Sequence, residues 1–356
     1  MNIKDIGTII TSFFKPRKTS FYPLTINYEI NSQCNLNCIM CNRKNFYQED
    51  HLMDFETFRN IYDQTRPSYA ALHGYGEPLL NKNLFKMINY AKSHSSKTTI
   101  TSNLVALQDR GEELIDSGLD LLKVSLDTTN PETYHQIRQV DSFSQVIENL
   151  KKLIEIKKIR KTNLPEIRIN FTIMKYNYKE IPEIIKLANY LGIKTILFQI
   201  LLFKDIFLRD NNEISDFQPQ DLKIELEKGI AESAKLSVQT NLPEIIADLP
   251  YLWYSYNKND SFSKKNKRRC LKPWISSYIS ANGDVKPCDC LGLTDVVMGN
   301  IYKQNFKEIW NSKEYQEFRQ AIKFFHRPNP ICRDCYPLGY LDFLKYRKKT
   351  KKYLSS

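Results

Sequence analysis

The chain has 356 residues, of which 42% are hydrophobic and 26% charged, and its formal net charge is +12. This composition is typical of a globular protein and excludes collagen-like, disordered and coiled-coil chains. The length exceeds what one hydrophobic core usually serves, so we expect a large domain and a smaller one.

The excess of basic charge lies in three segments. Residues 1–20 carry a net charge of +3, residues 257–272 carry +6 and residues 340–356 carry +5. The rest of the chain is close to neutral, so we expect no specific nucleic-acid partner for the body of the protein.

An amphipathic extension, residues 1–24, precedes the first predicted strand. Its apolar stretch from Ile6 to Phe14 is interrupted by polar residues and lacks a small-residue cleavage site, so it is not expected to be a secretory signal. No run of 18 apolar residues occurs, which excludes a membrane span. Residues 3–18 would suit a weak contact with a membrane surface, because basic residues follow the apolar ones.

From residue 25 to 205, β-rich runs alternate with amphipathic segments whose apolar residues recur at helical spacing. This alternation predicts an α/β fold with a parallel sheet covered by helices, either open or closed into a partial barrel. The six strands are expected at residues 25–30, 69–74, 98–103, 121–126, 166–174 and 195–203. Ligands in such folds bind at the carboxyl ends of the strands, where we therefore expect the site.

Three cysteines, Cys34, Cys38 and Cys41, follow the first predicted strand directly. Eight cysteines without an export signal indicate a reducing, cytoplasmic location, where clustered thiols bind metals or do redox chemistry. Three close thiolates can hold three irons of a 4Fe-4S cluster and leave the fourth iron open. The spacing alone also allows zinc, with His51 as a fourth ligand.

The Cx3Cx2C pattern after a first strand, in a chain of repeated βα units, resembles the radical S-adenosylmethionine (SAM) superfamily. Members hold a 4Fe-4S cluster with these cysteines, and SAM chelates the fourth iron. Further matching stretches are Gly74-Tyr75-Gly76-Glu77-Pro78, Ser102-Asn103, Val124-Ser125-Leu126-Asp127 and Ile137-Arg138. The resemblance implies SAM contacts for Gly76, Glu77, Pro78, Asn103, Ser125, Asp127 and Arg138. Tyr75 departs from the family's usual glycine, and Met40 from its usual aromatic residue.

After residue 205 the pattern changes. A helix is expected at 220–236, followed by a linker or loop rich in Tyr, Asn, Ser and Lys at 251–269. A hairpin is expected over residues 276–288, with Asn282 and Gly283 supplying the positive φ angles of its turn. One amphipathic helix is expected at 306–322.

The remaining cysteines surround this hairpin and helix. Cys270, Cys288, Cys332 and Cys335 form a complete four-thiolate set, which suits zinc or a 4Fe-4S cluster. The surrounding sequence resembles the C-terminal extension of SPASM and twitch-type radical SAM enzymes, which implies an auxiliary 4Fe-4S cluster on these four cysteines. Cys290 is then left over. Trp310 and Phe318 are expected to be core residues.

The resemblance implies a partial (β/α)6 TIM-like barrel with a small C-terminal α+β iron-sulfur domain. The expected divisions are the extension at 1–24, the radical SAM core at 25–205, a helical and basic linker at 206–269, the auxiliary cluster domain at 270–338 and a basic tail at 339–356.

The implied activity is that of a radical SAM oxidoreductase. SAM is cleaved reductively to a 5′-deoxyadenosyl radical, which abstracts a hydrogen atom from a peptide or small-molecule substrate. The auxiliary cluster would accept an electron from the substrate, and the first electron would come from a donor such as flavodoxin or ferredoxin. Proton acceptors near strand ends could be Lys123, Arg168, Lys175 or Gln199.

Two alternatives remain at this stage. The first is a radical SAM peptidyl epimerase in which Cys290 is the hydrogen-atom donor. The second is a zinc-stabilised RNA-binding module that uses the basic segments, although it gives no role to the Glu77-Pro78 and Ser125-Asp127 stretches.

Overall fold

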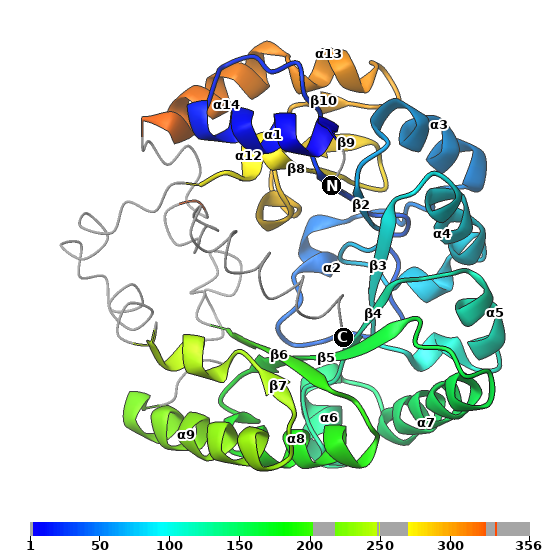
Figure 1. The fold of residues 1–356 in the computed structure, drawn as a ribbon, viewed down its shortest axis with the longest axis vertical. Coiled ribbons are helices and arrows are strands. Elements are labelled where there is room, and N and C mark those ends of the chain that lie inside the picture. The colour runs from blue at the N-terminus through cyan, green and yellow to red at the C-terminus, as the bar shows by residue number, and fades with distance from the viewer. Residues whose placement is uncertain (1–2, 202–217, 248, 250–269, 325–331, 333–356) are drawn as a thin grey trace.

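The computed structural model describes residues 3–201, 218–247, 249, 270–324 and 332. Within them, ten strands form one sheet in the order β10-β9-β8-β1-β2-β3-β4-β5-β6-β7 (Figure 1). The strands are β1 (Thr25–Tyr28), β2 (Tyr69–Ala71), β3 (Lys97–Ser102), β4 (Leu121–Ser125), β5 (Glu166–Ile173), β6 (Thr195–Ile200), β7 (Gln239–Thr240), β8 (Ser276–Ile279), β9 (Asp284–Lys286) and β10 (Gly299–Asn300).

The first six strands are parallel and lie in chain order, which confirms the predicted parallel α/β barrel arrangement. All six expected strands are present, although β2 ends three residues earlier than predicted. The sheet curves, and helices cover its outer side (Figure 1). The helices that follow β1 to β6 are α2 (Arg43–Phe46), α3 (Phe55–Thr65), α4 (Leu84–Ser93), α5 (Gly111–Asp116), α6 (Pro131–Arg138), α7 (Phe143–Ile159), α8 (Ile181–Tyr190) and α9 (Pro219–Lys235).

The two faces of the curved sheet differ in chemistry because side chains alternate along a strand. Ile100, Leu122 and Val124 are fully buried and belong to the apolar core beneath the helices. Thr101 and Lys123 alternate with them and are only partly buried. The outer face of the sheet therefore supplies the core, and the inner face carries polar groups.

The C-terminal region continues the same sheet. β8 pairs in parallel with β1, from Thr25 opposite Ser276 to Tyr28 opposite Ile279. β8 and β9 form the predicted antiparallel hairpin, and a short helix, α12 (Lys272–Ile275), precedes it. The turn differs from the prediction in one respect: Gly283 alone has a positive φ, of 87°, and Asn282 does not.

Two helices replace the single one expected at residues 306–322. α13 (Phe306–Trp310) ends at Asn311, whose side chain bonds the backbone of Thr19, and Ser312 caps α14 (Lys313–Lys323) by accepting from the Tyr315 N–H. Because Asn311 ends one helix and Ser312 begins the next, the helix is interrupted there although apolar residues keep helical spacing on both sides. Trp310 and Phe318 are core residues, as predicted.

The N-terminal extension forms the helix α1 (Ile3–Phe14), which packs against α12. Ile6, Ile10 and Phe14 on this helix are exposed. In the part of the chain that is described, no helix is both long and apolar enough to cross a membrane. The basic segments at 257–269 and 340–356 lie outside the described residues.

A buried cation joins the segment that follows α1 to the C-terminal region of the sheet. Arg319 is fully buried, and its guanidinium donates to the backbone carbonyls of Pro273 (3.0 Å), Trp310 (2.8 Å) and Arg17 (3.2 Å). It also stacks over the rings of Trp310 and Tyr315. Burial lowers the pKa of Arg319 to about 10, because it disfavours the charged guanidinium. The contacts with the carbonyls and rings stabilise that charge.

We predict that Arg319→Leu lowers the free energy of unfolding by about 3 kcal/mol, because it leaves three carbonyls without their donor. Arg59→Leu is the matched control, since Arg59 lies on the surface of α3 beside Glu56, and should cost under about 0.5 kcal/mol. Urea unfolding of both variants measures the difference. Equal midpoints would show that the bonds of Arg319 to Arg17, Pro273 and Trp310 do not stabilise the fold.

Candidate functional site

The first cysteine group lies in the loop between β1 and α2, at the carboxyl end of β1. Cys34, Cys38 and Cys41 line a small pocket together with Leu36, Asn37, Arg43 and Lys44. The Cys41 N–H donates to the Cys38 carbonyl at 3.0 Å. The loop is also bonded to the end of α6, where the Asn37 and Ile39 N–H groups donate to the carbonyls of Arg138 and Ile137.

A buried ion pair of Arg138 and Asp127 supports this loop. The Arg138 guanidinium also donates to the Ser125 carbonyl (3.0 Å) and to the Cys38 Sγ (3.3 Å). Asp127 accepts a further bond from the Thr172 N–H at 2.6 Å. Burial raises the pKa of Asp127, and Arg138 opposes this rise. A cation thus lies against a cysteine sulfur, where it stabilises negative charge on the thiolate.

Glu77 forms the second support. Its buried carboxylate accepts from the Ser102 hydroxyl (2.7 Å), the Asn103 N–H (2.8 Å) and the Leu79 N–H (3.0 Å). These bonds use three of about four acceptor positions on a carboxylate. Glu77 therefore joins the segment that follows β2 to the end of β3, a role that the sequence did not reveal. Its expected contact with SAM stays a prediction.

The other expected SAM residues lie around the same loop. The Asn103 amide donates to Asn35 Oδ1 at 2.9 Å and lies 3.9 Å from the Cys34 Sγ. Pro78 is buried at the start of a 3₁₀ turn, and Ser125 contributes its backbone carbonyl to Arg138. Gly76 packs so closely that a Cβ atom would lie 2.1 Å from the Asn31 carbonyl oxygen. The structure thus brings all seven residues together.

The chemistry of this group fits an iron-sulfur cluster with an anionic ligand. Burial raises the pKa of Cys34 to about 11, and burial also raises that of Cys41, so ligation must supply the energy to deprotonate them. The buried Arg138 Nε has no hydrogen-bond partner among the described residues and is a donor that an anionic group could use.

The alternative of a single zinc ion at the first cysteine group requires His51 to join the three thiols. In the described part of the chain, Cys288, Asp289 and Cys290 form a group whose ligand atoms all lie within 4.8 Å of one another, and Cys34, Cys38, Cys41 and His51 do not form such a group.

The second cysteine group lies beside the β8–β9 hairpin. Because β9 runs back along β8, Cys288 comes level with the start of β8. Cys288 is nearly buried and Cys290 is exposed. Burial raises the pKa of Cys270, and the nearby Cys290 contributes to this rise. Cys332 packs against the core, and Cys335 lies outside the described residues.

A half-buried ion pair accompanies these thiols. Lys272 Nζ and Asp289 Oδ1 are 2.7 Å apart. Burial lowers the pKa of Lys272, but Asp289 and the thiols of Cys290 and Cys288 more than offset this, so its pKa is raised. A lysine that stays charged beside three cysteines fits an anionic thiolate cluster at this place.

Glu29 connects the two cysteine groups. This fully buried carboxylate accepts from the Tyr75 N–H (2.9 Å), the Ala281 N–H (3.3 Å) and the Tyr47 hydroxyl. The Tyr75 hydroxyl in turn donates to the Asp289 carbonyl at 3.3 Å. Burial raises the pKa of Tyr75, and both Cys290 and Cys41 contribute, so this ring lies between the groups. Sequence reasoning missed Glu29, although an acidic residue at a strand end was a visible signal.

Comparison with known families supports the radical SAM interpretation of both cysteine groups. Residues 28–188 match the sequence model of the radical SAM superfamily. Residues 270–336 match that of SPASM, an iron-sulfur cluster-binding domain.

Two relatives match this chain over different shares of its length. It is 26% identical, over 89% of this chain and 88% of the relative, to the tungsten-containing aldehyde ferredoxin oxidoreductase cofactor-modifying protein of Pyrococcus furiosus. It is 31% identical to the probable GTP 3′,8-cyclase of Methanocaldococcus jannaschii, but over only 50% of this chain and 58% of that relative.

Solved structures show the same fold. Streptococcus suis SuiB bound to its precursor peptide SuiA matches with a TM-score of 0.64 and 18% identity, over 91% of this chain and 73% of SuiB. Native anSMEcpe with bound AdoMet and the Cp18Cys peptide matches with a TM-score of 0.60 and 19% identity, over 88% of this chain and 86% of that one.

Gly76→Ala tests whether the close packing at this position holds the cysteine loop. The new Cβ would overlap backbone atoms of residues 31–33, which precede Cys34 and cannot move aside as a side chain could. We expect about half of the bound iron to be lost and the free energy of unfolding to fall by about 2 kcal/mol or more.

The control is Gly192→Ala. Gly192 has a φ of 74° and no atom within 4 Å of a Cβ, so the variant should cost about 1 kcal/mol and keep its iron. Iron analysis after anaerobic reconstitution, together with thermal unfolding, measures both effects. Full iron content in Gly76→Ala would show that the loop does not depend on this contact.

Proposed function

Because the chain is a radical SAM protein with a C-terminal SPASM domain, we propose that it oxidises or otherwise modifies a peptide or small-molecule substrate at an unreactive C–H bond. When bound, the 4Fe-4S cluster and SAM supply a radical that removes a hydrogen atom from that bond. The observation that carries the proposal is the loop of Cys34, Cys38 and Cys41, held against the buried Arg138–Asp127 pair.

Each residue of the first site has a separate task in this proposal. The three thiolates would hold three irons and leave the fourth for SAM. Arg138 would stabilise negative charge at Cys38, and its unpartnered Nε could donate to the SAM carboxylate. Glu77 and Asn103 would keep the ends of β2 and β3 against the loop.

The second site would hold the auxiliary 4Fe-4S cluster through Cys270, Cys288, Cys332 and Cys335. With four thiolates it would have no open iron, so its task would be to accept an electron from the substrate. Lys272, which is charged and lies beside these thiols, would stabilise the reduced cluster, because reduction adds negative charge to it. A flavodoxin or ferredoxin would supply the electron to the first site, in the reducing cytoplasm.

The substrate is either a peptide or a small molecule, and the relatives support both. SuiB is described as bound to a precursor peptide, whereas the Pyrococcus furiosus relative is named for modifying a cofactor. The second of these matches along nearly the whole of both chains, so we give small molecules the same weight as peptides.

A second candidate is epimerisation with Cys290 as hydrogen-atom donor. One observation favours it: Cys290 is exposed while its neighbour Cys288 is buried. Its thiol is therefore reachable, although its place within 4.8 Å of Cys288 equally suits an alternative cluster ligand.

Cys38→Ala tests the first site. Anaerobic reconstitution of the wild type should give about eight irons per chain, and dithionite with SAM should release 5′-deoxyadenosine. The variant should lose about four irons and all cleavage, because an iron loses its ligand. Cys270→Ala is the counterpart: it should lose iron from the second site and still cleave SAM. Undiminished cleavage by Cys38→Ala would refute the proposal.

Cys290→Ala separates the two candidate reactions. Under the leading proposal the variant keeps about eight irons and still turns over. Under epimerisation the variant keeps both clusters but does not turn over. The product of the wild type in deuterated solvent then carries deuterium, which mass spectrometry detects. Loss of iron would make Cys290 a ligand and would overturn the four-cysteine assignment.

A further inference from the structure

Two cations lie side by side on the inner face of the sheet. Lys123 of β4 is directly opposite Arg168 of β5 in the parallel register. Both alternate with residues of the apolar core, such as Leu122 and Ile169, and so share the opposite face. Neighbouring strands are about 4.8 Å apart, and like charges placed opposite each other repel. Burial lowers the pKa of Lys123 to about 8, and Arg168 contributes to this shift.

The acidic groups nearby do not neutralise this pair. Asp289 is close enough to act on Lys123 but is already paired with Lys272 at 2.7 Å. Glu166 accepts from Arg168 Nη2 at 3.2 Å. Three cations therefore face two carboxylates among the described residues. His73 adds no charge, because burial and Lys123 lower its pKa to about 3.

Unpartnered polar atoms surround the same pair. Arg168 Nε, Asn170 Oδ1 and Thr99 Oγ1 are buried and have no hydrogen-bond partner among the described residues. Thr99 and Asn170 lie on the same face as the cations, since Thr101 is opposite Lys123 and strand residues alternate. Each unsatisfied buried group costs about 1–3 kcal/mol. A bound acceptor for the two donors, Arg168 Nε and Thr99 Oγ1, would recover part of this cost.

The inference drawn from these observations rests on the proposed function and adds a substrate class to it. We propose that Lys123 and Arg168 bind a carboxylate or phosphate group of the substrate. A guanidinium presents a fork of N–H donors that matches either oxyanion, and Lys123 adds a point charge beside it. The substrate is thus an anionic small molecule or a peptide that presents a carboxylate.

The position of this site along the strands suits a substrate. Lys123 lies two residues before Ser125, whose carbonyl bonds Arg138 at the first cysteine group. Two strand residues span about 7 Å, so an anion held at Lys123 would lie about that far along β4 from Ser125. Asp289, which lies between Cys288 and Cys290 in the sequence, is also near enough to act on the charge of Lys123.

The test is a calorimetric titration of the reconstituted protein, saturated with SAM and without reductant, with inorganic phosphate in one arm and glutarate in the other. Saturating SAM keeps both anions from reporting on the SAM site. At least one anion should bind the wild type. Lys123→Gln should weaken that binding at least about tenfold, whereas the charge-conserving Lys123→Arg should stay within about threefold. Arg160→Gln, whose guanidinium pairs with Glu112 and Asp116 instead, should bind as the wild type does.

A second measurement needs no variant. The effective anion should slow acylation of Lys123 at least about threefold in the wild type, as followed by mass spectrometry, and should leave the exposed Lys152 unaffected. Failure of both anions to bind, or equal affinity in Lys123→Gln and wild type, would overturn the proposal. Because no reductant is present, the result is independent of SAM cleavage, whose absence would instead refute the proposed function.

Discussion

The parallel pairing of β1 with β8 is the contact on which the rest of the structure depends. β1 leads into the loop of the first cysteine group, and β8 leads into the hairpin that carries Cys288. Their pairing makes the C-terminal region part of the same sheet as the barrel strands. Glu29 secures this junction by accepting from the N–H groups of Tyr75 and Ala281. The separation of the two cysteine groups is therefore set by strand register.

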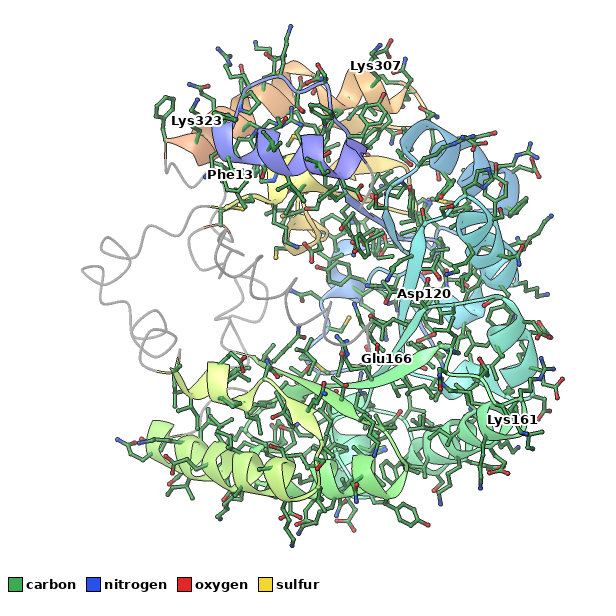
Figure 2. All side chains as sticks on the ribbon, in the orientation of Figure 1. Phe13, Asp120, Lys161, Glu166, Lys307 and Lys323 are labelled. Atoms are coloured by element: carbon green, nitrogen blue, oxygen red, sulfur yellow. The ribbon has the colours of Figure 1, made fainter. Side chains whose placement is uncertain are left out.

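Because side chains alternate along each strand, the two faces of the sheet have different roles. The outer face buries apolar residues under the helices, and this burial stabilises the fold. The inner face is thereby left for charged and polar groups that an ordinary core would exclude. Lys123 and Arg168 lie opposite each other on this face (Figure 2 shows the side chains on this sheet, with Glu166 labelled at the start of β5). The outer face of the strands thus stabilises the fold, and the inner face of the same strands carries the groups proposed to bind the substrate.

The sequence allowed the local features to be predicted and left the long-range ones open. Period-two and helical patterns located the six strands and most helices, and motif order identified the residues around Cys34. The β1–β8 pairing joins residues about 250 positions apart, and no local pattern encodes such a partner. The break at Asn311 depends on a contact with Thr19, and the burial of Arg319 depends on the carbonyls of Arg17, Pro273 and Trp310. Each of these needed the tertiary structure, because only there do the partners meet.

We propose that one sheet holds two iron clusters, at two separate cysteine groups. Anomalous diffraction at the iron absorption edge, from crystals of the reconstituted protein, would locate both. Two separate iron peaks are expected, one at Cys34, Cys38 and Cys41 and the other beside Cys288. A single iron peak, or anomalous signal that appears at the zinc edge instead, would contradict it.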